Sequence, residues 1–230
     1  MLEPGSEAQG VPLDVAAIRQ RIKAFLDAPS LDGRKLGNAK WGVYAFYDYD
    51  GEPIYVGQTN EMLRSRIGRH LTNQRTDAVA MNVLDPFEVA EIEVWPLWQL
   101  QSRDSRDGEA RAILNSAEYT VFQLVLNQSS FNAVLNEGDI TPTDPIELPL
   151  SVRGCIIPDE LYEQRKHPDV RIARRATTIA ALARVISERE VSKGLRRTLK
   201  TQARRLERLA SKRFNEIGGT VPTLTPGDEV

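Results

Sequence analysis

The sequence has little cysteine or histidine and no long apolar run. Its 230 residues contain one cysteine, Cys155, and two histidines, His70 and His167. These numbers exclude a disulfide framework and leave too few ligands for a Cys/His zinc site. No apolar stretch approaches the roughly 18 residues that span a bilayer, and residues 1–15 lack the order of a secretory signal. We therefore expect a cytoplasmic protein with no membrane partner.

Several common catalytic motifs are also absent. The chain has no Gly-x-x-x-x-Gly-Lys-[Ser/Thr] loop, no Gly-x-Gly-x-x-Gly after a strand, no Gly-x-Ser-x-Gly and no His-Glu-x-x-His. Phosphate-loop NTPases, dinucleotide enzymes, serine hydrolases and zincins therefore have no support. A carboxylate nuclease site ending in Glu-x-Lys also fails, because the candidate strand reads Glu91-Ile92-Glu93 with no lysine after it.

The net charge of −2 conceals two unlike parts. Residues 1–150 carry 13 Lys+Arg and 22 Asp+Glu, a net −9, whereas residues 151–230 carry 17 and 10, a net +7. A basic segment is often a solvated helix face, so this division alone does not establish nucleic-acid binding.

Hydrophobic periodicity and turn residues predict an α/β fold. The aromatic and β-branched runs at residues 41–47 and 53–57 flank Asp50-Gly51, which indicates a β-hairpin. A third strand is expected at residues 87–95. Helices are expected at residues 14–26, 61–71 and 109–127, and from about residue 169 to 217.

Two pairs of polar side chains each share one face of their element. Tyr44 and Tyr55 project from one face for any even loop length, because opposite residues then differ in parity. Arg66 and His70 stand four apart and share one helix face. Each pair also has an ordinary structural explanation: an aromatic pair in the core, and a solvated arginine with a capping histidine.

Glu118 lies among apolar neighbours. Leu114, Val121, Phe122 and Val125 occupy helical positions around it, so its carboxylate projects from an apolar stripe. Burial of an ionised carboxylate costs several kcal/mol unless a cation compensates it. The cation could be an arginine such as Arg66, in a structural pair, or a divalent metal ion.

In this order, the residues resemble the GIY-YIG nuclease superfamily. The two halves of the name match Gly42-Val43-Tyr44 and Tyr55-Val56-Gly57, with valine in place of isoleucine. The later positions of the family pattern fall on Arg66, His70, Glu118 and, in the pair Phe131-Asn132, on Asn132. A histidine at position 70 resembles the homing and restriction endonucleases of the superfamily.

This resemblance implies a small three-stranded antiparallel sheet flanked by helices, followed here by a C-terminal basic helical region. We accordingly divide the chain into an N-terminal helix and linker (1–38), a nuclease domain (39–140), a Pro-rich linker (141–160), a basic helical region (161–217) and a flexible tail (218–230). The resemblance does not extend to the basic region.

The resemblance also implies phosphodiester hydrolysis with one divalent ion, Mg²⁺ or Mn²⁺, on Glu118. Tyr44 would accept the proton of the attacking water, Tyr55 would orient the phosphate or the water, and Arg66 would donate to the developing charge. His70 would donate to the phosphate or assist Tyr44, and Asn132 would hold its loop.

A basic region beside an acidic nuclease domain suggests how DNA is attracted. We expect the DNA backbone to contact Arg64, Arg69, Arg174, Arg175, Arg196, Arg197, Arg204 and Arg205. The alternative is a basic helical hairpin that packs on the acidic domain.

The sequence therefore predicts a DNA endonuclease, with a role in restriction or defence. The alternatives are a structure-specific repair nuclease and a non-catalytic nucleic-acid-binding module with the same scaffold. One active site per chain would cut both strands as a homodimer or by sequential nicking.

Overall fold

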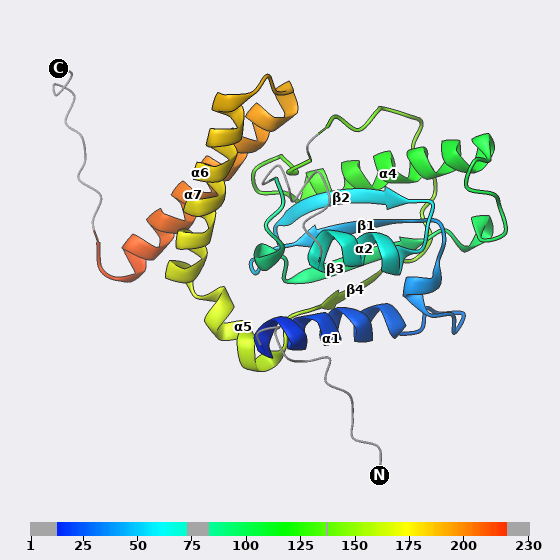
Figure 1. Ribbon diagram of the computed structural model, residues 1–230, viewed down its shortest axis with the longest axis horizontal. Coiled ribbons are helices and arrows are strands. Elements are labelled where there is room, and N and C mark those ends of the chain that lie inside the picture. The colour runs from blue at the N-terminus through cyan, green and yellow to red at the C-terminus, as the bar shows by residue number, and fades with distance from the viewer. Residues whose placement is uncertain (1–12, 73–82, 137, 220–230) are drawn as a thin grey trace, which may run out of the picture.

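The computed structural model describes residues 13–72, 83–136 and 138–219 (Figure 1). Most of the expected tail lies outside these residues, since the description ends at residue 219. The strands are β1 (Gly42–Tyr47), β2 (Pro53–Thr59), β3 (Glu91–Pro96) and β4 (Val152–Cys155). The helices are α1 (Leu13–Asp27), α2 (Leu63–Thr72), α4 (Gly108–Gln128), α5 (Asp159–Lys166), α6 (Pro168–Glu188) and α7 (Lys193–Glu216), with short 3₁₀ turns at Leu36–Asn38, Pro86–Glu88 and Trp98–Leu100.

The sheet is antiparallel with the order β2-β1-β3-β4, so it has four strands and not the expected three. The additional strand, β4, comes from the Pro-rich segment. Its four residues are too few for a two-residue alternation to be recognised in sequence. Arg153 of β4 anchors it to β3, because its Nε donates to Glu91 Oε2 at 2.7 Å.

Both faces of the sheet are covered, which is why every residue of β1 is buried. On one face, Tyr44, Phe46 and Ile92 pack with residues of α1 and α2. On the other face, Val43 and Ala45 pack against the apolar side of α4, whose buried residues are Ala110, Leu114, Ala117, Val121 and Val125. The strand that carries the first tyrosine is therefore held between two apolar layers.

The α6–α7 hairpin docks beside the β1–β2 turn, at the left of Figure 1, through a buried ion cluster. Asp48 accepts hydrogen bonds from Arg175 Nη2 at 2.7 Å and Arg205 Nη2 at 3.1 Å, and Arg171 Nη2 lies 3.2 Å away. Glu88 accepts from Arg175 Nε at 3.1 Å. These five residues form the Asp48 cluster.

The Asp48 cluster corrects two of the predicted DNA contacts. Arg175 and Arg205 are buried, with 6% and 2% exposure, and bind carboxylates of the acidic half of the chain. The basic hairpin packs on the acidic part of the protein because burying these guanidinium groups requires partners of opposite charge. In the part of the chain that the structure covers, no helix is long and apolar enough to cross a membrane.

Candidate active site

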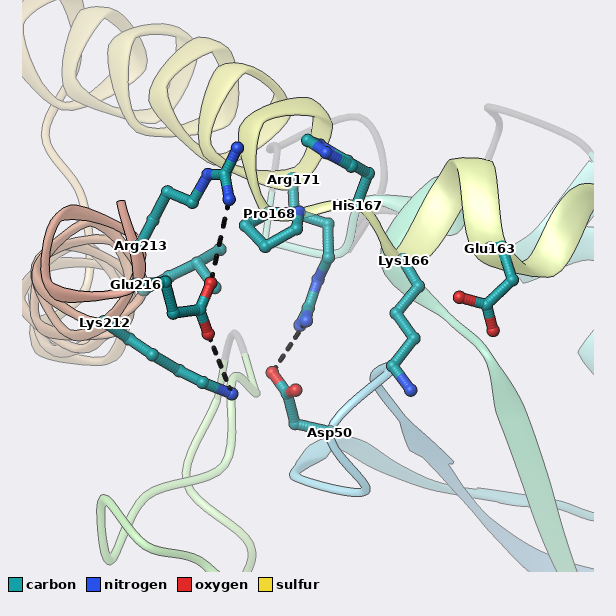
Figure 2. A pocket seen from close by; sticks show the side chains of 10 residues that line it. Asp50, Glu163, Lys166, His167, Pro168, Arg171, Lys212, Arg213 and Glu216 are labelled. Carbon is teal, nitrogen blue, oxygen red and sulfur yellow. Dashed lines mark hydrogen bonds and ion pairs between the residues drawn. The ribbon is translucent and has the colours of Figure 1, made fainter. Parts of the chain in front are cut away.

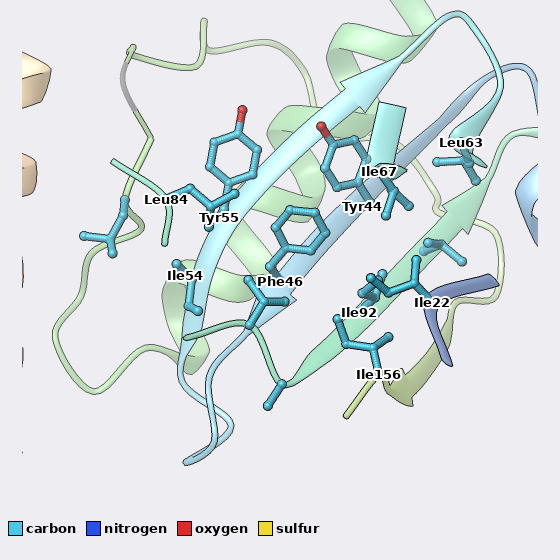
Figure 3. Packing of buried hydrophobic residues seen from close by; sticks show 14 of the residues in the cluster. Ile22, Tyr44, Phe46, Ile54, Tyr55, Leu63, Ile67, Leu84, Ile92 and Ile156 are labelled. Atoms are coloured by element: carbon cyan, nitrogen blue, oxygen red, sulfur yellow. The ribbon is translucent and has the colours of Figure 1, made fainter. Parts of the chain in front are cut away.

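The β1–β2 hairpin brings the two tyrosines together. Phe46 pairs with Tyr55 and Tyr44 pairs with Gly57, so both tyrosines lie on one face of the sheet, as their parity predicts. Their ring centroids are 6.3 Å apart, and both side chains are buried. Figure 3 shows their hydroxyl groups pointing toward the same side of the apolar cluster.

Gly57 is a glycine because Tyr44 lies directly across it. A Cβ atom at position 57 would stand 2.5 Å from Tyr44 Oη and 2.6 Å from Tyr44 Cζ, well inside van der Waals contact. The added Cβ atom would also lie 2.9 Å from Tyr55 Cε1. The second glycine of the sequence pattern thus provides the space in which the first tyrosine sits.

His70 is buried against the rings of both tyrosines and does not lie at the solvent-exposed edge of the core. Its ring centroid is 5.2 Å from that of Tyr55 and 5.8 Å from that of Tyr44, and the residue is 1% exposed. Burial, followed by the charges of Arg66 and Arg69, lowers the pKa of His70 to about 4, so the imidazole is neutral at neutral pH. Within the described residues, neither ring nitrogen makes a hydrogen bond.

A cavity of about 450 Å³ lies beside this cluster and joins β2, α2 and α4. Tyr55, Gly57, Arg66 and Glu118 line it. Glu118 is half-buried on α4, next to the buried residue Ala117. The structure therefore brings three of the predicted site residues, Tyr55, Arg66 and Glu118, to one cavity, whereas Tyr44 and His70 do not line it.

Asn136, and not the expected Asn132, lines the cavity. Asn132 is exposed, has a φ of 49° and does not line the cavity. Asn136 does line it, and its side chain donates to Val56 O at 2.8 Å and accepts from Val56 N at 3.3 Å. Sequence reasoning missed Asn136, for which the available signal was a second asparagine four residues after the first.

Of the remaining arginines that were expected to contact DNA, three are half-buried and three are exposed. Arg64 pairs with Asp27 at 2.8 Å, and Arg69 Nη1 donates to Glu61 at 2.9 Å, so both are engaged in ion pairs. Arg174 is half-buried over the ring of Phe87. The arginines that are exposed all belong to α7, namely Arg196, Arg197 and Arg204.

The cavity chemistry fits a hard divalent ion held by few protein ligands. Among the residues described, no group of three or more His, Cys, Asp or Glu side chains could hold a metal. Two carboxylates line the cavity: Glu118, and Asp139, which is paired with Arg197. The lining also includes the oxygen donors Asn136, Thr141 and Thr143. Mg²⁺ binds in this way, through one or two carboxylates, several waters and substrate phosphate.

A second cavity, of about 250 Å³, lies between the β1–β2 turn and helices α5 to α7 (Figure 2). Its lining is highly charged, but the charges compensate one another. Arg171 Nη1 pairs with Asp50 at 2.7 Å, and Glu216 lies within 4.0 Å of both Lys212 and Arg213. It holds none of the predicted catalytic residues, so the cavity with Tyr55, Arg66 and Glu118 is the candidate active site.

The site thus combines a hairpin with paired tyrosines, an arginine from α2 and a glutamate from α4 around one cavity. Residues 40–113 match the family model described as the GIY-YIG catalytic domain, which places this domain in the GIY-YIG superfamily. Domains of this superfamily are generally endonucleases and typically use divalent metal ions. Neither the curated proteins nor the solved structures yield a match to the chain.

Proposed function

We propose that the protein is a metal-dependent endonuclease that hydrolyses phosphodiester bonds in DNA. The observation that carries the proposal is the single cavity lined by Tyr55, Arg66 and Glu118, with Tyr44 packed against its wall at Gly57. Cationic, hydrogen-bonding and carboxylate groups thus face one space, as transfer at a phosphate requires.

Glu118 would hold Mg²⁺, or Mn²⁺ in its place, which when bound supplies polarisation of the scissile phosphate and stabilisation of the leaving oxygen. Arg66 would donate its fork of N–H groups to the phosphate, and Tyr55 would orient it. Tyr44 would accept the proton of the attacking water through a relay, since its own side chain is fully buried.

His70 and an asparagine would act as supports. The neutral imidazole of His70 packs against both tyrosine rings and would hold them in place. Asn136, with two hydrogen bonds to Val56, would fix the loop at the cavity edge in the role first expected of Asn132.

Substitution of Tyr44 by Phe tests the general base. Tyr44→Phe should fold and bind DNA normally but cleave plasmid about 10²- to 10⁴-fold more slowly, the range of general acid–base catalysis. Tyr49→Phe is the matched control, because Tyr49 is equally buried and its hydroxyl donates to Phe87 O at 3.3 Å, outside the site. Undiminished cleavage by Tyr44→Phe would remove Tyr44 from the mechanism.

Substitution of Glu118 by Ala tests the metal site. Glu118→Ala should abolish cleavage and weaken Mn²⁺ binding measured by calorimetry, while the thermal unfolding transition stays cooperative. If the variant loses its fold instead, the carboxylate is a buried structural partner and not a metal ligand.

The two asparagines allow a direct comparison. Asn136→Ala should lower the cleavage rate, because the loop loses both side-chain hydrogen bonds to β2. Asn132→Gly keeps the left-handed backbone without strain and should leave the rate unchanged. If Asn132→Gly lowers the rate and Asn136→Ala does not, then Asn132 and not Asn136 supports the site.

We further propose a role in restriction or defence, supported by the histidine at position 70. The assay is incubation of the protein with plasmid, branched DNA and RNA, with and without Mg²⁺. Discrete plasmid fragments support the restriction role, cleavage confined to branches would indicate repair, and binding without cleavage would indicate a non-catalytic module. Accumulation of nicked plasmid would distinguish sequential nicking from concerted cleavage by a homodimer.

A further inference from the structure

The two faces of α7 carry basic residues with different surroundings. The inner face buries Arg205 in the Asp48 cluster, together with Leu195 and Leu209. A cation also recurs at every fourth position of α7, and all of these residues are exposed. Because four residues exceed one helical turn, this row turns gradually around the helix, and its last member, Lys212, borders the second cavity. We call this set the α7 stripe; it consists of Arg196, Lys200, Arg204, Arg208 and Lys212.

The charges of the α7 stripe are poorly compensated within the protein. In the described parts of the chain, Arg196, Lys200, Arg204 and Arg208 have no ion pair with an acidic side chain, and Lys212 reaches Glu216 only at 4.0 Å. Like charges four residues apart on a helix destabilise it by about 0.2–0.5 kcal/mol per pair. Since each neighbouring pair in the stripe repels, the arrangement suits a polyanion outside the protein.

The α7 stripe begins beside the active-site cavity. Arg197, adjacent to Arg196, pairs with Asp139 at 2.7 Å, and Asp139 lines the cavity. Thr198 Oγ1 donates to the carbonyl of Asn136 at 3.4 Å, so the start of α7 is attached to the cavity edge. From there the helix leads away from the site (Figure 1).

We propose that the α7 stripe binds the sugar–phosphate backbone of duplex DNA on one side of the scissile phosphate. The inference rests on the proposed nuclease function and names the surface that holds its substrate. Lys212 lies 16 residues after Arg196, a rise of about 24 Å at 1.5 Å per residue. That length equals about seven base pairs at 3.4 Å each, so the enzyme needs a duplex flank of about seven base pairs on that side.

Salt-dependent binding tests the surface independently of cleavage. The double variant Lys200→Gln/Arg204→Gln, made in the Tyr44→Phe background, removes two cations of the stripe. By fluorescence anisotropy with a duplex, the slope of log K against log salt should become shallower by about 2, since each lost phosphate contact contributes about 0.9. An unchanged slope overturns the proposal.

The matched control changes the same charge at the same spacing elsewhere. Arg19 and Lys23 are exposed, four residues apart, on α1. Arg19→Gln/Lys23→Gln should leave the slope unchanged, and an equal change would show that only net charge matters, against the proposal. Thermal unfolding of both double variants should match that of the parent, because all four side chains are exposed.

The length of duplex that cleavage requires on each side of the scissile phosphate provides a second test of the α7 stripe. With the catalytically intact chain and Mg²⁺, shortening the duplex on one side from about ten to about four base pairs should lower kcat/KM, and the stripe variant should respond less. Equal sensitivity on both sides, or preference for single-stranded or RNA probes, refutes the assignment. If the chain binds duplex through the α7 stripe but never cleaves it, the proposed nuclease function is refuted whereas the proposed DNA-binding surface is supported.

Discussion

Replacement of Gly57 by alanine tests whether activity depends on the position of Tyr44. The added methyl carbon would stand 2.5 Å from Tyr44 Oη, whereas ordinary contact begins at 3.4 Å, so the phenol must move by about 0.9 Å. Misplacement of a reacting group by about 1 Å can cost about 100-fold in rate. Overpacking of this kind also costs about 1–3 kcal/mol of stability.

The assay compares single-turnover cleavage with urea unfolding of the same preparations. Gly57→Ala should remain folded but cleave about 100-fold more slowly. Gly68→Ala is the control, because Gly68 lies within α2 and an added Cβ there meets no atom within 4 Å. This variant should keep its rate and gain up to about 1 kcal/mol, the helix propensity difference between glycine and alanine.

Combination with Tyr44→Phe identifies the route of the effect. If Gly57→Ala acts by displacing the Tyr44 hydroxyl, it should slow an enzyme that already lacks this hydroxyl much less than the wild type. Rate losses that multiply fully would refute the reasoning, as would a folded Gly57→Ala protein with the wild-type rate.

Two further predictions concern stability. Asp48→Asn should lower the free energy of unfolding by about 3–5 kcal/mol, because it leaves buried guanidinium groups without their shared carboxylate; Glu188→Gln, in an exposed pair with Arg184, should change it by less than about 1 kcal/mol in the same urea titration. Folding lowers the pKa of His70 from 6.5 to about 4. Between these two pH values the imidazole is protonated in the unfolded chain but neutral in the folded protein. Stability should therefore fall by about 3 kcal/mol between pH 6.5 and 4, and His70→Leu should lack this component whereas His167→Leu should keep it.

The convergence of the tyrosines could be predicted from strand parity, although the structure reaches the expected register through a shift between Phe46 and Tyr47 that the sequence did not indicate. Strand parity places Tyr44 and Tyr55 on one face for any even loop. The position of Glu118 beside an apolar stripe likewise follows from helical periodicity, and the structure places it half-buried on the cavity wall.

The partners of the basic helices could not be predicted because they depend on contacts distant in sequence. Basic residues occupy both faces of α7, so periodicity does not distinguish the buried Arg205 from the exposed Arg204. Their difference arises from Asp48, which lies 157 residues before Arg205 in the turn of the β1–β2 hairpin. The choice between Asn132 and Asn136 likewise depends on how the loop returns to β2.

The distance in sequence between Asp48 and Arg205 also sets the order of events during synthesis. At about 5–20 residues per second, about 8–30 s pass between the appearance of the carboxylate and that of its last partner. Until α7 has left the ribosome, the turn that joins the two tyrosine-bearing strands lacks Arg205, although Arg171 and Arg175 of α6 are already present. The Asp48 cluster is therefore complete only after α7 has been synthesised, so a translation product that stops before α7 carries the tyrosine hairpin without all the contacts that anchor its turn.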